Sequence, residues 1–279
     1  MKDVKRDELE AISLEVRKDI VRMVGIARAN GPAPSLALAN LLVYLYWEWL
    51  NVRPAERKKP DRDRFVTSHW DAVPALYACL AHIGFFGREE LWSYRRLGAT
   101  LQGCPDLRTP GIDAPSGARG GSLGIAVGMC LALRLDNLES RVHCLLGEDE
   151  LREGVLWESV LSAASSGLGR LVAIIDVNRG GPARDAEAAA VSRGFEAFGW
   201  SVFEVNGGDF MLLDSVFSAL DFDDAKPKVI IARTKVDQEL SSIESLCDSA
   251  KPMSDDEMDH ALSLLERRSG SGGVFNDWT

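Results

Sequence analysis

The spacing of apolar positions predicts a helical first part of the chain. Over residues 7–29 apolar side chains recur at intervals of three and four, which is typical of an amphipathic helix. Residues 35–50 predict a second helix, with Ser35 as its N-cap. This helix is apolar on nearly every side, so we expect it to be buried on most sides, against this chain or against another one.

Further along, short and wholly apolar runs alternate with helical patterns. A continuous apolar run is typical of a strand in a parallel sheet with both faces covered. The alternation therefore predicts an α/β fold, a doubly wound parallel sheet flanked by helices. The predicted strands are 64–68, 141–147, 170–178, 200–207 and 226–234, and the further helices are 71–84, 88–98, 123–135, 153–167, 185–199, 209–221 and 254–268.

Two segments depart from this alternation. Residues 99–122 show no periodicity, and a loop of that length in a compact domain is usually functional or disordered. After residue 250 the pattern predicts one amphipathic helix, opened by Ser254 as a cap, and then a flexible end. We therefore expect one main domain over 1–250, followed by a C-terminal helix and tail over 251–279.

Composition restricts the class of protein. The formal net charge of −10 disfavours nucleic acid as a partner, because binding to a phosphate backbone needs a basic surface. Three of the five cysteines lie in apolar runs and none forms a CxxC pair, so we expect buried thiols in a reducing compartment. The N-terminus lacks the apolar stretch of a signal peptide, and no run is long enough to span a bilayer. A cytoplasmic protein without membrane contact is predicted.

The carboxyl ends of the predicted strands carry the candidate chemistry, because ligands of doubly wound sheets bind there. Three such ends are Ser68, Gly147 and Asn178. Glu148 and Asn178 are separated by one crossover helix, and their oxygens are suited to Mg²⁺ or Ca²⁺ and to a bridged diphosphate. Taken alone, such an acid is more often a helix cap or part of a solvated turn.

The complete run from Gly147 is more specific. It resembles the thiamine diphosphate motif of the transketolase family, G-D-G-x-x-x-E-G-x-x-W-E followed about thirty residues later by Asn. Here the motif falls on Gly147-Glu148-Asp149, Glu153-Gly154, Trp157-Glu158 and a closing Asp176-Val177-Asn178. Four further segments are similar to the family in the same order, namely "PDRDRFVTSHWDAVPALYA", "LQGCPD", "IAVGMCLALRL" and "FEAFGWSVFEVNGGD".

The resemblance implies the diphosphate-binding domain of that family, with thiamine diphosphate and Mg²⁺ or Ca²⁺ as cofactors. In the family a pyrimidine-binding domain follows, in the same chain or in a second one, and it carries the glutamate that activates the aminopyrimidine. The resemblance therefore implies a partner subunit with a pyrimidine domain, in an oligomer that uses the apolar helices.

The departures from the family pattern fall on residues that do chemistry. Four family histidines are replaced by Gly31, Asp71, Cys104 and Arg233. The metal-binding aspartate is Glu148, and the second glycine of the motif is Asp149, which adds charge and bulk beside a diphosphate. The glycine loop becomes Ser116–Ser122 and gains Arg119.

The candidate site residues follow from this correspondence. The catalytic candidates are His69, Asp71 and Cys104, the cofactor-binding candidates are Gly117, Arg119, Gly147, Asp149 and Glu153, and the metal candidates are Glu148 and Asn178. The alternatives are structural: a lone histidine at a strand end, an inert thiol, a glutamate that caps a helix and a polar residue that ends a strand. For Trp157 we expect packing.

The sequence thus predicts the N-terminal subunit of a split transketolase-like enzyme that transfers a two-carbon ketol or related acyl-anion unit. Because the imidazoles are missing, a specialised substrate is expected. The alternative is a non-catalytic homologue that has lost the cofactor and has a structural or regulatory role. A third possibility is a pocket that binds a different phosphate or metal ligand.

Overall fold

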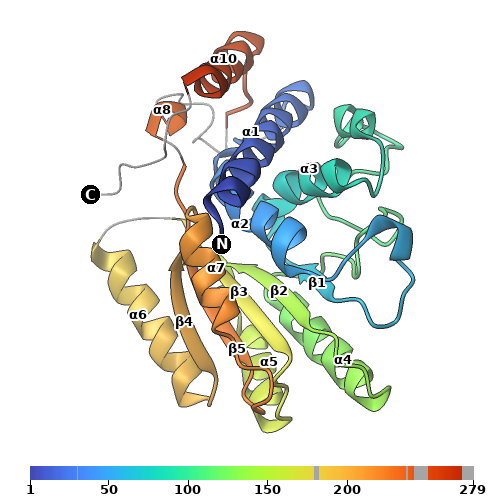
Figure 1. The fold of residues 1–279 in the computed structure, drawn as a ribbon, viewed down its shortest axis with the longest axis vertical. Helices are drawn as coiled ribbons and strands as arrows, with labels where there is room; N and C mark the ends of the chain where they lie inside the picture. The colour runs from blue at the N-terminus through green and yellow to red at the C-terminus, as the bar shows by residue number, and fades with distance from the viewer. Residues whose placement is uncertain (30, 179–181, 237, 242–250, 272–279) are drawn as a thin grey trace.

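A five-stranded, fully parallel sheet forms the centre of the protein (Figure 1). The computed structural model describes residues 1–29, 31–178, 182–236, 238–241 and 251–271. The strands are β1 (Arg64–Thr67), β2 (Val142–Gly147), β3 (Leu171–Val177), β4 (Ser201–Asn206) and β5 (Lys228–Arg233), in the order β1-β2-β3-β5-β4. The predicted α/β fold and all five predicted strands are confirmed.

Helices cover both faces of the sheet (Figure 1). Apolar residues of β3 alternate between the faces, because successive side chains of a strand point to opposite sides. Val172 and Ile174 join one core cluster, whereas Ala173 and Ile175 join the other. The first face is covered by α1 (Asp3–Ile26), α2 (Ala33–Tyr44), α3 (Val73–Ile83) and α7 (Phe210–Ser218), and the second by α4 (Gly121–Leu135), α5 (Gly154–Ser165) and α6 (Pro182–Ala197).

Short helical segments connect these elements. They are the π-helix η1 (Leu45–Trp49), the 3₁₀ segments η2 (Pro54–Glu56), η3 (Trp70–Ala72), η4 (Arg88–Ser93) and η5 (Glu148–Arg152), the short helix α8 (Gln238–Ser241) and the C-terminal helix α10 (Asp255–Ser271).

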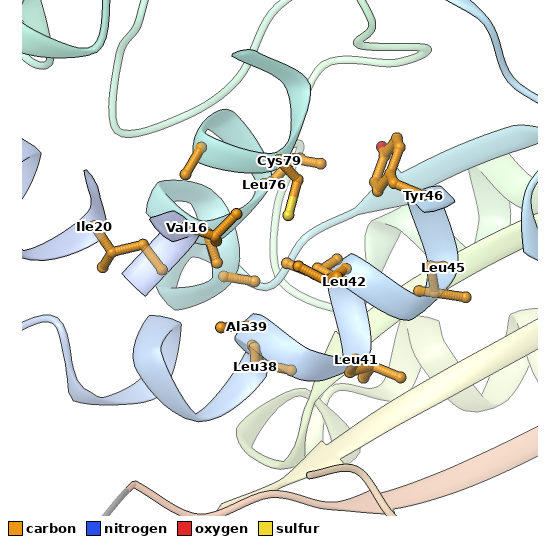
Figure 2. Close-up of a cluster of buried hydrophobic side chains, with 14 of the residues drawn as sticks. Val16, Ile20, Leu38, Ala39, Leu41, Leu42, Leu45, Tyr46, Leu76 and Cys79 are labelled. Atoms are coloured by element: carbon orange, nitrogen blue, oxygen red, sulfur yellow. The ribbon is translucent and has the colours of Figure 1, made fainter. Parts of the chain in front are cut away.

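The apolar helix α2 is enclosed by its own chain. Figure 2 shows its residues Leu38 and Leu42 together with Val16 of α1 and with Leu76 and Cys79 of α3. No second chain is therefore required to cover α2. Ser35 was wrongly predicted as the N-cap, because the helix begins at Ala33 after Pro32, and the Ser35 hydroxyl donates instead to the backbone oxygen of Asp71.

The predicted helix over 88–98 is wrong in type and length. Only the short 3₁₀ segment η4 forms there, with Leu91 as its buried residue. Arg95 adopts a φ of +59°, a left-handed conformation that is incompatible with a continuing right-handed helix. Leu91 and Tyr94 are the buried side chains of this stretch, and they provide too little apolar surface to stabilise a longer helix.

The C-terminal helix α10 packs against α1 (Figure 1). Ala261 and Leu265 are buried, and Met258 lies against Gly25, where an added Cβ would stand 2.5 Å from the Met258 sulfur. Ser254 caps the helix as predicted, since its hydroxyl accepts from the backbone N–H of Glu257 at 3.3 Å. The expected tail over 272–279 lies outside the described residues, and the proposed division at residue 250 stays a prediction.

The described cysteines are free thiols. Cys79, Cys130 and Cys144 are buried, as expected of the cysteines in apolar runs, and Cys104 is exposed. Cys247 lies outside the described residues. No helix in the described part of the chain is both long and apolar enough to cross a membrane.

Candidate functional site

The sheet register brings the three predicted strand ends to one edge. β2 lies between β1 and β3, with Thr67 opposite Leu145 and Gly147 opposite Asp176. Ser68, Gly147 and Asn178 therefore occupy the carboxyl ends of three adjacent strands, as the sequence predicts.

Glu150 joins the glycine loop to two of these strands. The residue is 2% exposed. One carboxylate oxygen accepts the backbone N–H of Gly147 at 2.8 Å, and the other accepts the Gly120 N–H at 2.5 Å and the Ser68 hydroxyl. A buried carboxylate needs such partners to offset the loss of hydration. Glu150 thus fixes the loop over the strand ends from within the motif.

The glycine loop also contacts the start of α5. Gly120 has a φ of +74°, and an added Cβ would stand 3.1 Å from the Cβ of Glu153. Both the left-handed conformation and this close approach require glycine. Glu153 is the N-cap residue of α5, and it is exposed and makes no side-chain capping bond. At Gly117, in contrast, an added Cβ would meet no atom within 4 Å.

A second buried carboxylate, Asp176, organises the other half of the edge. The residue is 1% exposed. Its carboxylate accepts from Thr234 Oγ1 at 2.5 Å and from Asn178 Nδ2 at 3.1 Å, and it lies 3.0 Å from Nε2 of His69. Because Asn178 donates its amide nitrogen to Asp176, its amide oxygen faces away from that carboxylate.

His69 is buried between Asp176 and Gly147. Burial by itself lowers the pKa of His69, but the hydrogen bond and charge of Asp176, with added charge from Asp71 and Glu150, outweigh burial, so the pKa is raised. An added Cβ on Gly147 would stand 2.7 Å from His69 Nδ1. The glycine at position 147 therefore makes room for the imidazole ring.

The other two catalytic candidates, Asp71 and Cys104, both act on the charge of Tyr94. Burial raises the pKa of Tyr94 to about 12, against a lowering by Arg95 and with a further rise from Cys104 and Asp71. Asp71 and Cys104 are themselves exposed. The structure therefore places His69 inside the sheet edge, whereas Asp71 and Cys104 lie at the surface near one tyrosine.

Arg119 and Asp149 form an ion pair across the loop. Their closest nitrogen and oxygen are 3.9 Å apart, and both side chains are about half exposed. The Arg119 guanidinium also lies 5.7 Å from the ring centroid of Trp70. Asp149 therefore has a compensating charge from the arginine that the loop gains relative to the family pattern.

The replacement of the fourth family histidine, Arg233, ends β5. Its guanidinium lies 3.6 Å from Glu204 of the edge strand β4.

Trp157 packs on Phe195 and Phe198, and its indole N–H donates to the backbone oxygen of Leu151 at 2.9 Å. The packing prediction for Trp157 is confirmed.

Sequence reasoning overlooked Glu150 and treated Asp176 only as part of a closing motif. Both left a signal. Glu150 follows Gly147 by three residues, the spacing at which an acidic side chain can accept a backbone N–H at a helix start. Asp176 is an acid inside an otherwise apolar strand, and a charge in that environment requires partners.

A metal-bridged diphosphate would lie beside the glycine loop, at the strand ends. The open space at Gly117 leaves room for a ligand beside the loop. Among the residues described, no group of three or more His, Cys, Asp or Glu side chains is placed to hold a metal ion. Glu148 and the Asn178 amide oxygen would supply only part of a coordination shell, as is usual when phosphate oxygens and water complete a Mg²⁺ site.

Comparison with known proteins agrees with this geometry. Residues 11–263 match the family described as "Transketolase, thiamine diphosphate binding domain". The chain is 33% identical over 244 residues to one subunit of the apulose-4-phosphate transketolase of Phocaeicola vulgatus, covering 86% of this chain and 87% of that protein. It is 30% identical over 245 residues to human transketolase, covering 86% of this chain and 39% of that protein.

The fold comparison gives the same result. The crystal structure of transketolase from Campylobacter jejuni matches with a TM-score of 0.79 and 25% identity, over 92% of this chain and 42% of that one. The chain thus spans most of the Phocaeicola vulgatus relative but less than half of these two transketolases. By the match over residues 11–263 and the likeness to both kinds of relative, the chain belongs to the transketolase family and contains its thiamine diphosphate binding domain.

Proposed function

We propose that this chain is the diphosphate-binding subunit of a split, thiamine diphosphate-dependent transketolase-like enzyme that transfers a two-carbon ketol unit. The observation that carries the proposal is the cluster around Glu150, which joins the glycine loop, the end of β2 and the end of β1. Such a cluster keeps the loop in place before any ligand arrives. The length match to a relative that is itself named as one subunit of a transketolase supports the division between two chains.

The residues have distinct roles in this proposal. Gly117 and Arg119 would hold the diphosphate, and Glu148 and Asn178 would hold Mg²⁺. When bound, thiamine diphosphate supplies the stabilisation of the two-carbon carbanion. His69 has a positioning role, because Asp176 holds its ring against Gly147 and its side chain is nearly closed to solvent.

The exposed groups lie where a substrate or the partner can reach them. We assign Asp71 and Cys104 to contacts with substrate, beside Tyr94. A carboxylate and a thiol at positions where the family has imidazoles change both charge and proton exchange near neutral pH. This difference supports a two-carbon donor or acceptor other than the ordinary sugar phosphates.

The partner in the proposal is a chain with a pyrimidine-binding domain. It supplies the glutamate for the aminopyrimidine, so this chain alone has an incomplete site. A cytoplasmic location of the complex stays a prediction; the free thiols of the described cysteines are compatible with it.

Calorimetric titration with thiamine diphosphate and Mg²⁺, with and without the partner, tests the proposal. We expect binding that tightens when the partner is present, together with ketol transfer by the complex only. Asn178→Ala should lose Mg²⁺-dependent binding. The matched control Glu139→Gln, at a nearly fully exposed side chain preceding β2, should not change it.

Two results would contradict the proposal. If neither the chain nor its complex binds the cofactor, the protein is a structural or regulatory homologue. If Mg²⁺ and inorganic phosphate bind but thiamine diphosphate does not, the pocket takes a different ligand.

A further inference from the structure

Side chains from three different segments of the chain meet beside the glycine loop. Arg119 comes from the loop itself, Asp149 from η5 and Trp70 from η3. The guanidinium lies near both the Asp149 carboxylate, at 3.9 Å, and the Trp70 ring, whose centroid is 5.7 Å away. Trp70 is 42% exposed, so part of its ring is open to solvent beside the guanidinium.

The backbone donors beside this cluster are already used. The N–H groups of Gly120 and Gly147 both donate to the buried carboxylate of Glu150. A loop of this kind normally attracts an anion through such N–H groups. In this chain those two donors are satisfied internally, so a side-chain donor at the same edge adds attraction for an anion that they no longer supply.

Acidic side chains increase that need. Glu148 and Asp149 lie in η5 and Glu153 lies at the start of α5, and each negative charge there repels an approaching phosphate. Arg119 lies opposite Asp149, and its planar guanidinium can bind two phosphate oxygens at once. The Trp70 ring adds a cation–π contact that limits the orientations of the guanidinium.

We propose that Arg119 is the diphosphate-binding side chain of this protein, and that Asp149 and Trp70 position its guanidinium beside the glycine loop. This inference rests on the proposed function, because it names the group that recognises the cofactor's charge there. The inference also gives Asp149 a role. With Arg119 present, the Asp149 carboxylate holds the guanidinium; without Arg119, the same carboxylate would only repel a diphosphate. Arg119 and Asp149 then act as a coupled pair.

A double-mutant cycle tests the coupling. The full chain, in complex with its partner, is titrated calorimetrically with inorganic pyrophosphate plus Mg²⁺ and separately with thiamine diphosphate plus Mg²⁺. Arg119→Ala should weaken the binding of both ligands at least tenfold. Asp149→Asn alone should weaken binding, because the guanidinium loses the carboxylate that positions it. The double variant should bind clearly better than Arg119→Ala alone, because the repulsive carboxylate is then gone.

Two further variants define the role of the aromatic ring and of charge in general. Trp70→Phe keeps a ring face and should keep most of the affinity, whereas Trp70→Ala should lose part of it. The matched control is Arg134→Ala, which removes one positive charge from the C-terminal end of α4, where Arg134 donates to the backbone oxygen of Ser166. Binding by this control should equal that of the wild type.

The outcomes separate this inference from the proposed function. Wild-type binding with an unchanged affinity in Arg119→Ala overturns the inference alone. If Arg119→Ala lowers the binding affinity by the same factor in the wild type and in the Asp149→Asn variant, the two residues are not coupled. Absence of wild-type binding to either ligand overturns the inference and the proposed function together. Urea unfolding of each variant shows whether the protein is folded. Because the substituted side chains are partly exposed, the unfolding midpoints should match that of the wild type.

Discussion

At the scale of single residues, two interior histidines have opposite environments. His69 is next to a buried carboxylate that favours its charged form, and its pKa is raised. His143 is fully buried in β2, accepts the Trp49 indole N–H at 2.8 Å and has its pKa lowered to about 4, chiefly by burial and against the charge of Asp63. His69 therefore belongs to the charged strand-end site, whereas His143 serves as a neutral acceptor in the core.

The close approach of His69 leads to a prediction for Gly147. Replacing Gly147 by Ala places a Cβ 2.7 Å from Nδ1 of a ring that Asp176 holds in place. Because the ring cannot move without losing that bond, Gly147→Ala should destabilise the protein by about 1–3 kcal/mol. Urea unfolding measures the change.

Gly128→Ala is the matched control for this substitution. Gly128 lies on an exposed face of α4 with no atom near an added Cβ, so Ala should stabilise by up to about 1 kcal/mol. Equal stability of the Gly147→Ala variant and the wild type would contradict the packing of His69 against Gly147.

The lowered pKa of His143 predicts a loss of stability in acid. The unfolded chain binds a proton on this ring below about pH 6.5, whereas the folded protein does not bind it until about pH 4. The contribution of this group is therefore complete above pH 6.5 and is lost as the pH falls from 6.5 to 4. A difference of about 2.5 pKa units corresponds to about 3 kcal/mol.

His143→Gln provides the test, because Gln keeps an acceptor for Trp49 and does not titrate. The difference in unfolding free energy between wild type and His143→Gln should change by about 3 kcal/mol between pH 7 and pH 4. His260→Gln, at an exposed position of α10, is the matched control. Parallel profiles of wild type and His143→Gln would contradict the prediction.

At the scale of elements, the π-helix η1 determines where the side chain of Trp49 lies. The end of the second predicted helix winds as the π-helix η1, and its last residue Trp49 both reaches His143 and stacks on Arg141, whose guanidinium is 4.4 Å from the ring centroid. A π-turn adds a residue to a helical turn and so rotates the side chains that follow. Hydrophobic periodicity does not reveal this rotation, because nearly all residues around it are apolar or aromatic.

The packing of α10 on α1 predicts a difference between two neighbouring leucines. Leu265 is 1% exposed, whereas Leu264 is only half-buried. Leu265→Ala should therefore cost about 2–5 kcal/mol through lost burial and a residual cavity. Leu264→Ala, the same chemical change one residue away, should cost clearly less.

Thermal or urea unfolding of both leucine variants checks this prediction. A similar small loss in both would show that α10 is not part of the cooperative unit of the sheet domain. That result would support a domain boundary near residue 250, whereas the expected difference would place α10 within the main domain.

At the scale of the whole molecule, the site is built at an open edge of the sheet and has its buried charges already paired. Glu150 is satisfied by the glycine loop and the strand ends, and Asp176 by Thr234, Asn178 and His69, so the edge is formed without a ligand. A preformed site that binds only in the folded state should stabilise the complete fold through mass action.

Cofactor binding should therefore raise the thermal midpoint of the complex with the partner. At a free concentration of one hundred times Kd the stabilisation is about 2.7 kcal/mol, or on the order of 5 °C for a chain of this size. Differential scanning calorimetry with thiamine diphosphate and Mg²⁺ measures it. Thiamine without its diphosphate should give no shift, and a shift of equal size with thiamine would contradict a site that recognises the diphosphate.

Apart from the helix expected over 88–98, the sequence by itself determined the order of the main helices and strands, the parallel sheet and the three strand ends that form the site. These depend on local periodicity and on the apolar character of strands covered on both faces, which are visible in neighbouring residues. The family motif from Gly147 to Asn178 is likewise a local run with a fixed spacing.

The tertiary structure alone decided the partners of the charged groups. Glu150 meets Ser68 across 82 positions of the chain, and Asp176 meets His69 across 107. The Arg119–Asp149 pair likewise joins a loop to a strand end about thirty positions away. Such pairs depend on which strands are adjacent in the sheet and on the register between them. The residue pattern within a segment carries no information on either the adjacency or the register.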